Sequence, residues 1–191
     1  EHGAIGPVVI EDCIAFSNGF LPDRSKPAKG DGNGYKLGSD SHAVPHIVRR
    51  CIAFHNRKHG FTYNKNLGPI EISNCTSWHN SMETPDTQNR QDYNFNFSDG
   101  DHIMYNNLSW EGGGSDVGHV PSGETVHHNV FYKKDKGTYE NDMGVTLTVE
   151  DFLVKPTYQF GVSPFTRNED GSINYGSFLQ LAPNSDLRGA G

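Results

Sequence analysis

The sequence lacks any long apolar run, and no stretch approaches the roughly 20 apolar residues that a membrane-spanning helix needs. It also lacks an excess of basic residues, because 23 acidic against 16 basic side chains give a formal charge of −7. A nucleic acid or an anionic membrane therefore gains no long-range attraction, and we expect neither as a partner. A local cluster of Lys and Arg can still bind an anionic substrate.

Cysteine is scarce, with an odd count made of Cys13, Cys51 and Cys75. No CxxC pair or Cys/His spacing typical of zinc is present. Each cysteine occupies the same place in a repeated pattern. This favours three buried, stacked small side chains over a disulfide or a nucleophile.

Helical periodicity is also missing, whereas turn formers are abundant. Glycine accounts for 22 of the 191 residues, and only 34% of the residues are hydrophobic, a composition that favours strands and turns over helix. The length suits a single domain over residues 1–191. The first residues, EHGAIGPVVIEDC, enter a strand at once, and Glu1 does not open a signal peptide. We therefore expect the chain to begin within a longer protein.

One pattern recurs along residues 1–135: an alternating strand, a small or polar residue at a bend, and a short segment ending in an aromatic. The copies are VVIEDCIAFSN at 8–18, HIVRRCIAFHN at 46–56, IEISNCTSWHN at 70–80, HIMYNNLSWEG at 102–112 and TVHHNVFYKK at 125–134. Repeats of this length with a short β-rich unit predict an all-β solenoid, a parallel β-helix. We expect the recurring aromatics to stack in its interior and asparagines at the bends to form ladders. The aromatics are Phe16, Phe54, Trp78, Trp110 and Tyr132.

A second alignment lies between those copies, in DGNGYKLG at 31–38, RKHGFTYN at 57–64 and DYNFNFSD at 92–99. It places Tyr35, Phe61 and Phe95 in one register and Lys36, Thr62 and Asn96 in the next. Neighbouring residues of a strand point to opposite faces. If the aromatics point inward, the second set lines an exposed polar groove.

The pattern fades after residue 135. We expect residues 136–191 to form a C-terminal coil and a cap over the open edge of the solenoid, with a last strand at Phe178 to Leu181.

The succession VVIEDCIAFSNG, GDGNGYKLG, CIAFHNRKHGFTYN and CTSWHNS resembles the family 9 polysaccharide lyases, the calcium-dependent pectate lyases and rhamnogalacturonan lyases. The resemblance covers residues 1–110 well. It implies a right-handed parallel β-helix, of which this chain forms the C-terminal coils. It also implies a secreted, periplasmic or cell-surface enzyme that cleaves acidic plant cell-wall polysaccharide at galacturonate by β-elimination.

The resemblance identifies Lys36, in GNGYKLG, as the catalytic base. The family's calcium ligands lie in a motif resembling SDDGWD, which would precede Glu1, so the implied partner of this chain is the missing N-terminal part of the same protein. Calcium needs several oxygen ligands, and the acids of this chain share no spacing that would provide them. Those acids are Asp31, Asp40, Asp99 and Asp116.

Elimination requires a base for the C5 proton and a cation that stabilises charge on the uronate carboxylate. We expect Thr62, Lys65, Arg90 and Asn96 to bind substrate, because Lys and Arg suit carboxylates and the others share the groove. Arg57, Lys58 and His59 are weaker candidates.

Two other functions fit the same fold. A glycosidase needs clustered carboxylates, and the outward register of Lys36, Thr62 and Asn96 contains none. A non-catalytic carbohydrate-binding solenoid would use aromatics such as Tyr63 and Tyr93. Among lyase substrates, polygalacturonate is slightly favoured over rhamnogalacturonan I.

Overall fold

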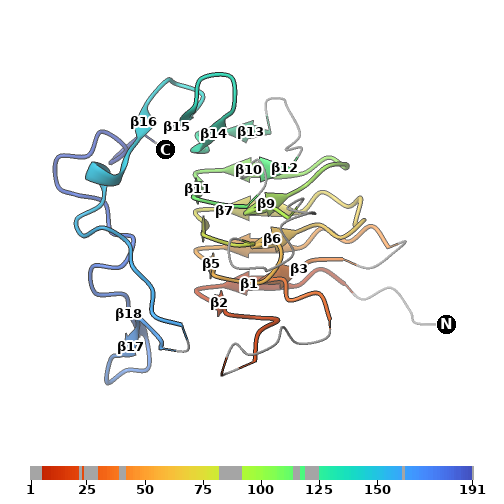
Figure 1. The fold of residues 1–191 in the computed structure, drawn as a ribbon. Helices are drawn as coiled ribbons and strands as arrows, with labels where there is room; N and C mark the ends of the chain where they lie inside the picture. The colour runs from red at the N-terminus through yellow and green to blue at the C-terminus, as the bar shows by residue number, and fades with distance from the viewer. Residues whose placement is uncertain are drawn as a thin grey trace.

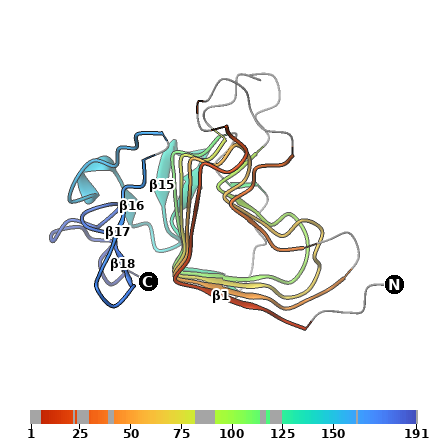
Figure 2. The same ribbon diagram turned by 90° about the horizontal axis from the view of Figure 1, so that it is seen from below.

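The protein is an all-β parallel β-helix, as the repeats predict. The computed structural model describes residues 6–21, 23, 30–38, 42–81, 92–113, 117–118, 125–160 and 162–190. Successive coils stack on one another, so that three parallel sheets run along the helix (Figures 1 and 2). No helix in these described ranges is long and apolar enough to cross a lipid bilayer.

Each of the first four copies of the repeat supplies one strand to each of the first two sheets, and the fifth copy supplies a strand to the first sheet alone. The first sheet contains β1 (Val9–Glu11), β4 (Ile47–Arg49), β7 (Glu71–Ser73), β10 (Ile103–Tyr105) and β13 (Val126–His127). The second contains β2 (Ile14–Phe16), β5 (Ile52–Phe54), β8 (Thr76–Trp78) and β11 (Leu108–Trp110). The third contains β3 (Tyr35–Lys36), β6 (Phe61–Thr62), β9 (Phe95–Asn96) and β12 (Val117–Gly118).

Asparagine side chains tie the coils together at the bends, as predicted. The buried Asn80 side-chain oxygen accepts hydrogen bonds from the backbone N–H (3.0 Å) and the side-chain amide (2.9 Å) of Asn56. The Asn107 amide group likewise donates to the Asn129 oxygen at 2.8 Å. These contacts satisfy buried backbone groups that the bends would otherwise leave unpaired.

The cysteine prediction is correct for two of the three residues. Cys51 and Cys75 are buried, and the Cys51 backbone N–H donates to the Cys75 sulfur at 3.5 Å. Cys13 is exposed because it lies on the first described coil, where no further coil covers it. All three are free thiols.

The aromatic column of the second sheet does not stack in the interior, which corrects the prediction. Phe16 and Phe54 do stack, with ring centroids 5.0 Å apart. However, Ala53 faces the core of the helix, and Phe54 belongs to a separate cluster on the outer face. Tyr158 packs edge-on against Phe54 at 5.2 Å. The aromatics are therefore buried between the helix and the C-terminal segment.

The chain after residue 130 first forms an antiparallel sheet at the end of the stack, made of β14 (Phe131–Lys133), β15 (Thr138–Glu140) and β16 (Thr146–Leu147). After the 3₁₀ turn η1 (Val149–Asp151) it returns along the outer side of the second sheet (Figures 1 and 2). We call residues 148–190 the C-terminal arm. The arm carries one hairpin, β17 (Thr166–Arg167) and β18 (Ile173–Asn174).

The arm departs from the sequence prediction in two respects. It covers the side of the helix, where Phe178 packs on Trp78 with ring centroids 5.5 Å apart. The strand predicted at Phe178 to Leu181 is wrong, because these residues form turns and Leu181 alone makes an isolated bridge, with Phe152.

Candidate functional site

The third sheet places the predicted groove residues side by side, and their predicted register is confirmed. Lys36 pairs with Thr62, and Thr62 pairs with Asn96. The preceding aromatics stack on the opposite side of the sheet, with ring centroids 4.7 Å apart for Tyr35 and Phe61. Phe61 and Phe95 are fully buried. The aromatic ladder therefore fixes the rotation of each strand and the direction of Lys36.

The glycines before Lys36 allow the coils to approach closely. A Cβ built on Gly34 would lie 2.5 Å from the Gly60 carbonyl oxygen, closer than such atoms can pack. The Gly34 N–H donates to the His59 carbonyl at 2.9 Å, and the Tyr35 N–H donates to the Gly60 carbonyl at 2.8 Å. The GNGYKLG motif thus sets the spacing and register of β3 against β6, and thereby the position of Lys36.

Lys36 lies at one corner of an exposed charged cluster. Its Nζ is 2.8 Å from Asp31 Oδ2, and Lys58 Nζ is 3.3 Å from Asp31 Oδ1. The exposed fraction of the side chain is 45% for Lys36, 49% for Asp31 and 37% for Lys58. Hydrogen bonds from Lys36 and then Lys58 hold the pKa of the Asp31 carboxyl below its usual value. Asp31 is therefore ionised at neutral pH.

A polar pocket of about 290 Å³ adjoins this cluster across β6 and β9. It is lined by Asp31, Asn33, Lys58, His59, Thr62, Tyr63, Asn64, Lys65, Asn96 and Ser98. Three of the four residues predicted to bind substrate, Thr62, Lys65 and Asn96, are thus brought together, whereas Arg90 lies outside the described residues.

Thr62 is 3% exposed, so the expectation that it lies on the open surface is wrong. Its hydroxyl accepts hydrogen bonds from the Asn96 side-chain amide at 3.2 Å and from the Asn64 backbone N–H at 3.3 Å. Thr62 therefore forms the floor of the pocket, beneath residues of the next coil and the following turn.

His59, one of the weaker candidates from the sequence, also lines the pocket. Its Nδ1 accepts a hydrogen bond from the Tyr93 backbone N–H at 2.9 Å, and its Nε2 lies 3.2 Å from Asp92 Oδ1. Burial lowers the pKa of His59, and the nearby Asp92 carboxylate acts in the opposite direction. The alignment of Asn33, His59 and Tyr93, two positions before the stacked aromatics, was the signal that could have revealed it.

The described residues do not fit a calcium site. They contain no group of three or more His, Cys, Asp or Glu that could hold a metal ion. Asp31, the acid nearest to Lys36, has both carboxylate oxygens bound to lysines.

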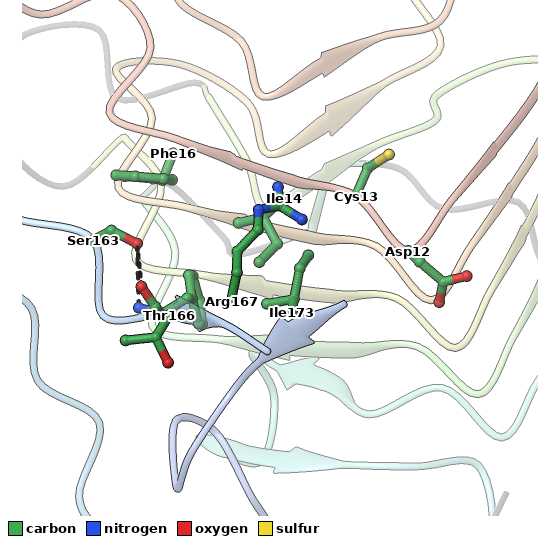
Figure 3. Close-up of a pocket in the computed structure, with 9 residues that line it drawn as sticks. Asp12, Cys13, Ile14, Phe16, Ser163, Thr166, Arg167 and Ile173 are labelled. Carbon is green, nitrogen blue, oxygen red and sulfur yellow. Dashed lines mark hydrogen bonds between the residues drawn. The ribbon is translucent and has the colours of Figure 1, made fainter. Parts of the chain in front are cut away.

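A second pocket, of about 320 Å³, lies between the first coil and the C-terminal arm (Figure 3). Ile14 and Phe16 line it from β2, and Arg167 and Ile173 face them from the hairpin of the arm. Its described lining residues are mostly uncharged, and the charged ones are Asp12 and Arg167. Its chemistry suits packing between the arm and the helix rather than binding of a polyanion.

Comparison with known proteins agrees with this geometry. Residues 2–106 match the family model described as Pel9A-like, right handed beta helix region. Over its whole length the chain is 42% identical to pectate lyase L of Paenibacillus polymyxa (strain SC2), and over 96% of its length it is 29% identical to pectate lyase L of Dickeya chrysanthemi.

Each of these two alignments spans 38% of the relative's own length. A solved structure, the crystal structure of pectate lyase Pel9A, matches 94% of the chain and 39% of that protein, with a TM-score of 0.64 and 28% identity. The family match covers more than half of the chain and includes the motif around Lys36. This chain therefore belongs to the Pel9A-like family of right-handed β-helices, the family 9 polysaccharide lyases that its sequence resembles.

Proposed function

We propose that this chain carries the catalytic surface of a pectate lyase that cleaves pectic polymers at galacturonate by β-elimination, with Lys36 as the base. The observation that carries the proposal is the position of Lys36. It stands on the outer face of β3, in the motif GNGYKLG, beside a polar pocket that contains Lys58 and Lys65. β-Elimination from a polyuronate requires an accessible amine as the base and neighbouring cations that bind the carboxylates.

In the proposed reaction, the neutral Lys36 amine takes the C5 proton of a galacturonate. The C5–H electron pair forms the C4=C5 double bond, the C4–O bond breaks, and the departing oxygen takes a proton from solvent. Charge that develops on the C6 carboxylate needs a cation close by. Lys65 and Asn96 bind the neighbouring sugars, over the floor formed by Thr62.

We propose further that the chain acts as part of a longer protein, because it spans only 38% of the relatives that it matches throughout. Strands β1, β2 and β3 are edge strands of their sheets, so that a preceding coil can pair with them. Calcium dependence, which the resemblance implies, needs ligands from beyond the described residues. A secreted, periplasmic or cell-surface location would bring such a protein to plant cell walls.

The charges in the pocket favour elimination over hydrolysis. Hydrolysis of a glycoside requires a pair of carboxylates. Among the described lining residues Asp31 is the one acid, and two lysines hold it, whereas Asp92 contacts His59 from outside this lining. A non-catalytic binding module remains the alternative, because Tyr63 also lines the pocket.

The test uses the full-length protein with polygalacturonate or rhamnogalacturonan I, in calcium or in chelator. Absorbance of the unsaturated uronide reports elimination. We expect calcium-dependent product, faster from polygalacturonate, that Lys36→Ala abolishes. Loss of activity without loss of the folded state, checked by circular dichroism, assigns the effect to the amine. A folded wild-type protein that yields no product from either polymer would overturn the proposal and favour the binding module.

A further inference from the structure

The loop that carries Asp31 is fixed to the next coil. The Lys58 backbone N–H donates to the Gly32 carbonyl at 3.1 Å, and Arg57 Nη1 donates to the Gly30 carbonyl at 3.2 Å. Gly32 adopts a positive φ of 71° and packs so closely on Gly19 that an added Cβ would lie 2.8 Å from the Gly19 Cα. These contacts fix the backbone beside Asp31, whereas its half-exposed carboxylate is held by the two lysines.

Two ammonium groups from neighbouring coils converge on this one carboxylate. Lys36 binds one oxygen and Lys58 binds the other. When Lys36 serves as the neutral base of the proposed reaction, Lys58 is the remaining ammonium group of the cluster, so a uronate carboxylate competes with that of Asp31 for Lys58. All three side chains are more than a third exposed, so a polymer can reach them.

The bound fragment of Asp31 resembles the reacting fragment of a uronate. In Asp31 a carboxylate is attached to the Cβ carbon, and in galacturonate the C6 carboxylate is attached to C5. If a uronate carboxylate lies between the two lysines as the Asp31 carboxylate does, C5 is the next carbon and Lys36 is within reach of its proton. Proton transfer requires this proximity.

We propose that Lys58 binds the C6 carboxylate of the galacturonate whose proton Lys36 removes, and that Asp31 holds this place until substrate displaces it. This inference rests on the proposed function and adds a binding residue and a competing internal carboxylate to it. In this arrangement Lys58 holds the substrate carboxylate in place while Lys36 takes the proton.

The test measures kcat and KM of the full-length protein on polygalacturonate. We expect Lys58→Ala to raise KM about tenfold, because a charge-assisted hydrogen bond to the carboxylate is lost. Lys58→Arg keeps the charge and should recover most of the affinity. Asp31→Asn removes the competing charge and should lower KM about threefold. Lys134→Ala, at an exposed lysine beyond β14, is the matched control and should behave as wild type.

The outcomes separate this inference from the proposed function. A wild-type protein without lyase product refutes the function and, with it, the inference. An active wild type whose KM is the same in Lys58→Ala and Lys134→Ala overturns the inference alone. An Asp31→Asn variant with a raised KM would show that Asp31 supports the site instead of competing for it, which also contradicts the inference.

Discussion

Replacement of Asn80 by alanine tests the asparagine ladder that joins the coils on which the candidate site lies. Asn80 is fully buried, and its side-chain oxygen accepts two hydrogen bonds from Asn56. Its amide group donates to the Ala53 carbonyl at 3.1 Å. The substitution therefore leaves the Asn56 backbone N–H and the Ala53 carbonyl without this partner, whereas the Asn56 side-chain amide keeps its hydrogen bond to the Ala15 carbonyl.

Each buried polar group that loses its partner costs about 1–3 kcal/mol, so two such groups predict a loss of about 4 kcal/mol in the free energy of unfolding. Urea denaturation followed by the fluorescence of Trp78 and Trp110 measures this loss. Asn174→Ala, at an exposed asparagine of β18, is the control and should cost less than about 1 kcal/mol. A loss below about 1 kcal/mol for Asn80→Ala would refute the account of the ladder.

Three further predictions concern the site. Gly34→Ala should lower lyase activity at least tenfold in a folded protein, because its Cβ would lie 2.5 Å from the Gly60 carbonyl oxygen; unchanged kcat/KM would contradict this. Because the pKa of Asp31 is lowered in the folded state, this carboxylate stabilises the fold above its ordinary pKa of 3.8, and the stabilisation is lost as the pH falls below 3.8. Denaturation curves of Asp31→Asn should therefore show a smaller loss of stability in acid than those of the wild type. The lowered pKa of His59 means that acidification below its ordinary pKa of 6.5 destabilises the fold, because the unfolded state binds the proton more readily. His59→Gln should flatten the stability curve just below that pH, and an unchanged slope would show that other groups cause it.

The sequence was informative where local spacing determines the structure. Glycine and aromatic positions recur in the segments around Lys36, and neighbouring residues of a strand must face opposite sides. The pairing of Lys36, Thr62 and Asn96 was therefore predictable without coordinates. The bend asparagines were predictable for the same reason, because equivalent positions of successive coils stack directly.

Features that depend on distant segments were not predictable. The alternation of Ala53 and Phe54 shows that they face opposite sides, but it does not show that Tyr158 covers the outer one. The Nε2 atom of His59 contacts the carboxylate of Asp92, which lies on another coil. The burial of Thr62 likewise results from the residues of the next coil, which spacing within one strand does not reveal.

Mass spectrometry of the products tests the central claim most directly. Full-length protein and its Lys36→Ala variant are incubated with polygalacturonate, and the mass of each new non-reducing end is determined. Elimination predicts fragments whose new non-reducing ends are lighter by one water than those of hydrolysis. Only the wild type should form them. Fragments of hydrolytic mass, or dehydrated fragments formed equally fast without the Lys36 amine, would contradict the account.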